Sequence, residues 1–130
     1  MDQEQLNEGL WMAARLGQTE KVEYYIKRGA DVNWKSPYSY GQSPLFVASV
    51  SGHTETVSRL VDLGADIEAK DDLGQSPLFV ASWNGHTETV SRLVDLGADI
   101  DDKDNLGDTP YDVAGNDKIR ELLKVDIFVS

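Results

Sequence analysis

The sequence predicts an all-α solenoid, a stack of repeated helix pairs, and three observations lead to this fold class. First, the 33-residue segment 42–74 returns as residues 75–107 with changes at only five positions. Second, a serine or threonine followed by proline recurs in successive units. Third, glycines recur at fixed places where a helix would end. A unit of this kind buries its apolar face only by stacking on its neighbours.

The first helix of an internal unit is predicted to begin at the Ser-Pro pair. The hydroxyl of Ser43 can accept a hydrogen bond from an unpaired backbone N–H, which makes serine a favourable N-cap. The proline that follows lacks an N–H that its position does not need. Ser76 and Thr109, each followed by proline, repeat the pattern and predict two further starts. Leu45 and Ala48 then fall on one face of the helix, which we expect to pack against a neighbour.

A Gly-His pair breaks the first helix, and a second helix is predicted over residues 54–63. Val57, Leu60 and Val61 have the i, i+3, i+4 spacing of an apolar stripe on one helix face. Gly64 can then adopt the left-handed conformation that ends a helix. The polar, turn-rich segment that follows predicts a projecting, hairpin-like finger that leads into the next unit.

The same pattern can be traced to both ends, so we expect residues 1–130 to form one domain of four units. The units cover about residues 6–38, 39–71, 72–104 and 105–124, with residues 125–130 as a tail. Two alternatives stand for this tail: that it folds back over the last unit, or that it begins a further segment. The first unit is predicted to start at an Asp2 cap paired with Gln5, and its finger is two residues longer. The last unit lacks about one helical turn between its helices. Distinct end units are needed because each end of a stack faces water.

These patterns resemble the ankyrin-repeat family over about residues 6–123, with the first and last repeats acting as caps. The matching residues, each repeated 33 positions later, are Gly41, Ser43-Pro44-Leu45, Ala48, Gly52-His53, Val57, Leu60-Val61 and Gly64-Ala65-Asp66. The resemblance implies L-shaped units of antiparallel helices, with a concave face made by the fingers and first helices. It also implies a protein-binding module. The family usually has histidine where Phe46 and Phe79 stand, so we expect apolar packing to replace its hydrogen bonds.

Composition narrows the expected partners and location. The chain carries 12 basic and 23 acidic residues, a net charge of -11, which repels nucleic acid and anionic lipid and attracts basic protein surfaces. The alternative is that this charge only keeps a monomer soluble. No apolar run approaches the ~20 residues that span a bilayer. The chain has no cysteine, and its acidic N-terminus lacks the features of a signal peptide. We therefore expect a cytoplasmic monomer, with the nucleus as an alternative location.

The sequence does not predict a catalytic or metal site. His53 and His86 occupy the same place in successive repeats, and helices packed roughly 8–10 Å apart would hold them too far apart to share a zinc ion. We expect them to bridge adjacent loops. The acidic run 99–104 fails as a calcium loop, because Val113 stands where such a loop needs glutamate. The chain is therefore predicted to need no cofactor and not to be an enzyme.

The candidate binding residues come mainly from the positions where the two near-identical repeats differ. Shared positions are explained by packing, whereas differences collect where the family resemblance places the contact surface. Trp83 is the strongest candidate, because exposed tryptophan is enriched at binding hot spots. Aromatic residues on the longer first finger add to it, although they could instead pack on one another. The candidates are Trp34, Tyr38, Tyr40, Val50, Ser51, Asp72, Trp83, Asn84, Asp101, Asp102 and Asn105.

The preferred interpretation is a small adaptor or inhibitor that binds a protein through its concave face and fingers. An aromatic groove with an acidic rim would suit a partner that offers basic and apolar side chains. The alternative is an engineered or structural repeat scaffold without a dedicated partner. The near-identity of two units fits recent tandem copying and deliberate construction equally well.

Overall fold

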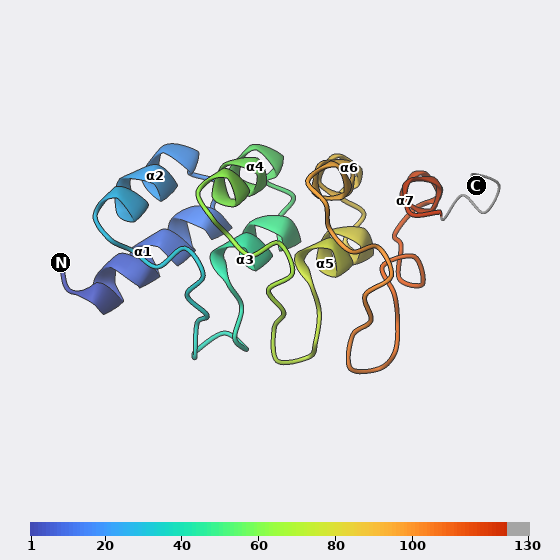
Figure 1. The fold of residues 1–130 in the computed structure, drawn as a ribbon, viewed down its shortest axis with the longest axis horizontal. Helices are drawn as coiled ribbons and strands as arrows, with labels where there is room; N and C mark the ends of the chain where they lie inside the picture. Colours follow the sequence, from blue (N-terminus) through green and yellow to red (C-terminus); the bar gives the residue numbers. More distant parts are fainter. Residues whose placement is uncertain (125–130) are drawn as a thin grey trace.

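In the computed structural model, which describes residues 1–124, helices are paired into units that follow one another along a stack (Figure 1). The helices are α1 (Gln3–Arg15), α2 (Thr19–Lys27), α3 (Pro44–Val50), α4 (Thr54–Asp62), α5 (Pro77–Trp83), α6 (Thr87–Asp95) and α7 (Asp117–Leu122). The first helices α1, α3 and α5 form one row, and α2, α4, α6 and α7 form the other. The predicted all-α stack of helix pairs is confirmed.

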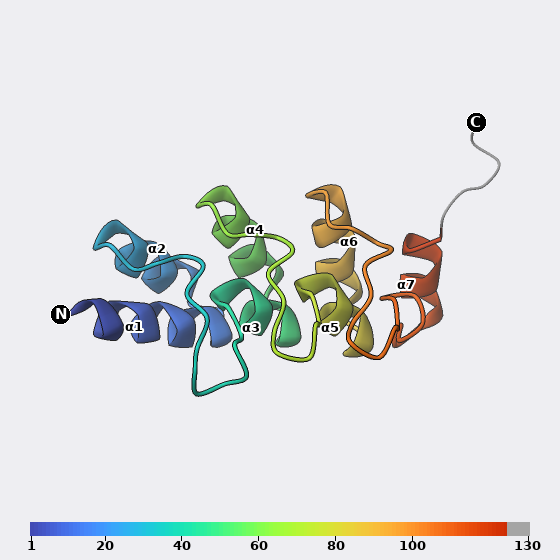
Figure 2. The ribbon, with the colours of Figure 1, turned by 60° about the horizontal axis from the view of Figure 1, so that its bottom comes forward.

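Three fingers, here residues 29–42, 64–75 and 97–108, project from the same side of the stack (Figure 2). Within residues 1–124 the fingers contain no regular strand, and an isolated antiparallel bridge joins Ser36 to Gln42 in the first finger. The fingers are hairpin-like in their course, and backbone hydrogen bonds from Asp71 N to Gln75 O at 3.1 Å and from Asp104 N to Asp108 O at 3.0 Å close the turns of the second and third. None of the helices in the described part of the chain is long and apolar enough to cross a membrane.

The predicted helix starts form as expected in the first three units. Asp2 and Gln5 make a reciprocal capping box, with Gln5 N donating to Asp2 Oδ1 at 2.8 Å and Asp2 N donating to Gln5 Oε1 at 3.0 Å. The Ser43 hydroxyl accepts from the Phe46 N–H at 3.1 Å, and the equivalent hydroxyl caps α5. These caps fix where each first helix begins.

The prediction of a first helix in the fourth unit is wrong, because the chain there forms only one turn. The Thr109 hydroxyl does accept a hydrogen bond from Asp112 N at 3.2 Å, but only one turn follows, over residues 110–113. The chain then crosses to the end of α5, where Gly115 N donates to Ser82 O at 2.8 Å. A side chain at residue 115 would meet the backbone of Gly85 at 2.9 Å, so only glycine fits where the chain crosses to the end of α5.

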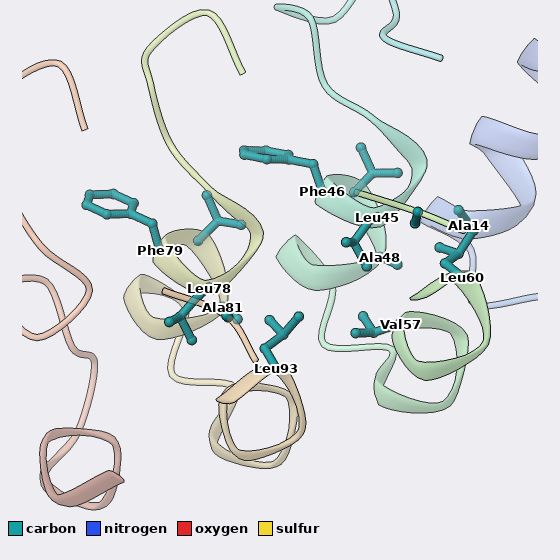
Figure 3. Packing of buried hydrophobic residues seen from close by; sticks show 14 of the residues in the cluster. Ala14, Leu45, Phe46, Ala48, Val57, Leu60, Leu78, Phe79, Ala81 and Leu93 are labelled. Carbon is teal, nitrogen blue, oxygen red and sulfur yellow. The ribbon is translucent and has the colours of Figure 1, made fainter. Parts of the chain in front are cut away.

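Burial differs between the two rows of helices. Every residue from Pro44 to Ser49 in α3 is buried, because this helix lies between neighbours on both sides. The outer helix α4 buries only Thr56, Val57 and Leu60. Phe46 and its equivalent Phe79 are buried in the apolar core, as predicted (Figure 3).

Hydrogen bonds repeat from unit to unit and join them. His53 Nε2 lies 3.1 Å from Arg15 O, and His86 Nε2 lies 2.8 Å from Val50 O, which confirms that these histidines bridge adjacent repeats. Asn116 takes the same place in the fourth unit, where its amide reaches Thr87 Oγ1 at 3.1 Å. Stacking therefore rests on both apolar contacts and recurring polar ones.

Candidate protein-binding groove

An open groove of about 360 Å³ lies between the first helices α3 and α5 and the first two fingers, on the predicted concave face. We call it the central groove. It brings together four of the predicted site residues: Tyr40, Val50, Trp83 and Asn84. Its other apolar lining comes from Phe46, Leu73 and Val80. The groove is thus built from two pairs, each a finger and the helix that follows it, which lie 33 residues apart in sequence.

Trp83 is the last residue of α5, and its side chain is 58% exposed. Its ring lies 6.0 Å from the ring of the buried Phe79, with an angle of 56° between the planes. This contact restricts the indole from one side while most of it remains accessible. The same position in the preceding repeat carries Val50, so the change to tryptophan adds an exposed aromatic surface to the groove.

Tyr40 lies at the end of the first finger and is 71% exposed. Its φ of 54° is the only positive value for a non-glycine residue in the described part of the chain. Left-handed backbone is unfavourable for tyrosine. The neighbouring finger holds it, because Asp72 N donates to Tyr40 O at 2.9 Å. The end of the longer first finger therefore reaches the central groove.

A second hollow of about 200 Å³, here the N-terminal hollow, lies between α1 and the first finger. Trp34 and Tyr38 line it together with Trp11 and Met12 of α1. The Trp11 indole N–H donates to Gln42 O at 2.9 Å and joins the helix to the finger. The predicted aromatic residues of the first finger are thus divided between two sites. Ring-to-ring contacts among residues 1–124 are found elsewhere, at Tyr24–Tyr25 and Phe79–Trp83.

The remaining predicted site residues lie outside the central groove. Asp102 forms an ion pair with Lys70 at 2.8 Å, and Asn105 Nδ2 donates to Asp72 O at 3.2 Å. These contacts join successive fingers. Asp101 is exposed near the base of the third finger, and Ser51 is the exposed C-cap of α3. The differences between the two repeats therefore include residues that align the fingers.

Sequence reasoning missed the leucines at the finger tips. Leu73 is 57% exposed and lines the central groove, and its equivalent Leu106 is 87% exposed. Both are shared between the repeats, and shared positions were attributed to packing. The exposure of these leucines could have been predicted from the local sequence. Each stands in a turn, between aspartate or asparagine and glycine, and therefore belongs to no apolar helix stripe that could bury it.

Glu68 of the second finger should give stability a measurable pH dependence. Burial raises the pKa of its carboxyl above the usual 4.5, and nearby Asp99, Asp102 and Asp66 act in the same direction, whereas the hydrogen bond from Asp99 N opposes them. Its Oε1 atom is buried without a hydrogen-bond partner among residues 1–124. The folded state therefore binds the proton more tightly, so stability falls as pH rises from about 4.5 through the raised pKa.

The variant Glu68→Gln keeps an acceptor for Asp99 N but cannot ionise. We expect it to be more stable than the original protein at about pH 7, with the difference disappearing below about pH 4. Urea unfolding midpoints at the two pH values measure this. A stability difference of the same size at both values would contradict the role of ionised Glu68.

The central groove offers apolar contact and one carboxylate, from Asp71. Its lining residues include no histidine, serine or cysteine that could act as a base or nucleophile. Within residues 1–124, no three histidine, aspartate or glutamate side chains are arranged to hold a metal ion. An apolar concave surface with a few polar groups is typical of a binding site.

Comparisons with known proteins agree with this architecture. The Transient receptor potential cation channel subfamily A member 1 homolog of Caenorhabditis elegans is 42% identical over 72 residues, covering 55% of this chain and 6% of that protein. Human Histone-lysine N-methyltransferase EHMT1 is 36% identical over 59 residues, covering 45% of this chain and 4% of that protein. The chain thus spans only a small part of the length of these curated relatives. The family described as Ankyrin repeats (3 copies) matches residues 10–104. The chain therefore belongs to the ankyrin-repeat family.

Proposed function

We propose that this protein is a non-catalytic adaptor or inhibitor, acting in the cytoplasm or nucleus, that binds a segment of a partner protein in the central groove. Ankyrin repeats imply a protein-interaction module. The observation that carries the proposal is the exposure of Trp83, Tyr40 and Leu73 around one groove. Large exposed aromatic and aliphatic side chains grouped at a concavity are typical of an interaction site.

The surrounding charge indicates the chemistry of the partner. The net charge of -11 favours association with a basic surface and slows the approach of an acidic one. The apolar lining favours aliphatic or aromatic side chains on the same partner. A partner segment that carries both basic and apolar side chains therefore fits the groove best. The chain binds this segment as a monomer.

The variant Trp83→Val tests the proposal, because it gives α5 the residue that α3 carries at the same position. We expect it to fold normally and to weaken partner binding at least about tenfold, as loss of a tryptophan hot spot does. Proteins captured by the original chain from a lysate of its source cells would be identified, purified and titrated against both forms by calorimetry.

Tyr24→Ala is the matched control, since Tyr24 is an exposed aromatic residue on the outer helix α2. It should leave the affinity within about twofold. If a captured protein binds Trp83→Val as tightly as the original, the groove is not the binding site. Capture of nothing at all would favour the scaffold without a dedicated partner.

A further inference from the structure

The central groove contains one carboxylate, which belongs to a largely buried residue. Asp71 lines the groove and is only 8% exposed. Its Oδ1 atom accepts hydrogen bonds from Leu73 N at 3.1 Å and Gln75 N at 2.9 Å. Its Oδ2 atom accepts no hydrogen bond among residues 1–124 and is not one of the fully buried unpaired atoms there, so solvent reaches it, and Asp71 belongs to none of the ion pairs found in those residues. One carboxylate oxygen thus remains open to a ligand.

A carboxylate in such a place favours a cationic ligand. The groove lining contains no lysine or arginine to pair with Asp71, and a carboxylate forms its strongest hydrogen bonds with cationic donors. The exposed rings of Trp83 and Tyr40 line the same groove, and aromatic faces attract cations. Carboxylate and rings therefore favour the same kind of group, while Leu73 and Val50 provide apolar surface beside them.

We propose that the central groove receives an arginine side chain of the partner, followed in its sequence by an aliphatic residue. The guanidinium group stacks on an aromatic ring and donates an N–H to Asp71 Oδ2, and the aliphatic side chain contacts Leu73 and Val50. Arginine suits the site better than lysine, because its planar group stacks on aromatic rings and is less strongly hydrated. This inference rests on the proposed function and specifies which side chain of the partner anchors it in the groove.

The repeat provides a matched control for Asp71. Asp104 occupies the same position in the third finger and is 9% exposed. Its Oδ1 accepts from Leu106 N at 3.1 Å and Asp108 N at 2.9 Å, so it stabilises the same turn. Asp104 does not line the central groove. Asparagine at either position keeps an Oδ1 acceptor for the turn and removes the charge.

The test is an NMR titration of the full chain with two capped dipeptides, acetyl-arginyl-leucine amide and acetyl-citrullyl-leucine amide. Citrulline has nearly the shape of arginine but no charge. We expect the arginine peptide to shift the Trp83 indole N–H and the Leu73 amide, and to bind about fivefold or more tighter than the citrulline peptide. Asp71→Asn should abolish this preference, whereas Asp104→Asn should preserve it.

Equal affinities for the two peptides, shifts confined to other surfaces, or no shifts would each overturn the inference. So would a preference lost equally in both asparagine variants. If Asp71→Asn does not fold, Trp83→Val provides the second test, and an unchanged arginine preference in that variant counts against the site. A partner that needs Trp83 but binds Asp71→Asn normally would leave the proposed function standing and exclude the arginine anchor.

Discussion

Replacing Leu60 with alanine is expected to lower the free energy of unfolding by about 2–5 kcal/mol. Leu60 lies in α4 and is fully buried. It belongs to the apolar core shared by successive repeats (Figure 3). The truncation loses apolar contact and leaves a cavity that neighbouring helices on both sides hold open. Urea unfolding followed by circular dichroism would measure the change.

Ser91→Ala is the control for this prediction. Ser91 lies in α6 at the position equivalent to Ser58, but only Ser58 accepts a hydrogen bond from Arg92, at 2.6 Å. We expect Ser91→Ala to change stability by no more than about 0.5 kcal/mol. If the two variants unfold at similar urea concentrations, the stripe of α4 does not face the core.

Replacing Gly52 with alanine is expected to destabilise the protein by about 2–5 kcal/mol through two separate effects. The φ of Gly52 is 73°, in the left-handed region that side chains disfavour. An added Cβ would also lie 2.6 Å from the His86 ring, which makes the bridge to Val50 O. Either the ring or the backbone must therefore move, and the bridge between repeats is lost.

Gly85→Ala separates the two effects, because Gly85 occupies the same position one repeat later with a φ of 74°. The nearest atom to its added Cβ is Asn116 Nδ2 at 3.7 Å, an ordinary contact. We expect this variant to cost only about 1–2 kcal/mol, the strain of a left-handed residue. Equal losses for the two variants, measured by urea unfolding, would show that crowding against His86 contributes nothing.

Most of the fold could be predicted from the sequence, because its signals are local. The capping box at Asp2, the Ser-Pro start at Ser43 and the apolar stripe containing Leu60 each depend on residues within a few positions of one another. The exception was the turn at Thr109. A correct cap could not reveal that Gly115 must pass close to the backbone of Gly85, since that contact joins two repeats.

The candidate site was predictable only in part. Exposure at Trp83 followed from its place outside the helix stripe, but sequence could not divide Tyr38 and Tyr40 between two hollows. It also could not distinguish Asp102, which pairs with Lys70 across 32 positions, from an aspartate free to meet a partner. Such distinctions depend on how the fingers lie against one another.

The sequence alone therefore determined the repeat, the starts of the helices in the first three units and the family resemblance, because each depends on a short stretch of chain that recurs along the sequence. Only the tertiary structure decided which side chains share a groove. Tyr40, Asp71 and Trp83 come together because stacking places a finger of one unit beside the helix of the next. Near-identical repeats thereby acquire different surroundings, so Asp71 lines the groove and its counterpart Asp104 does not.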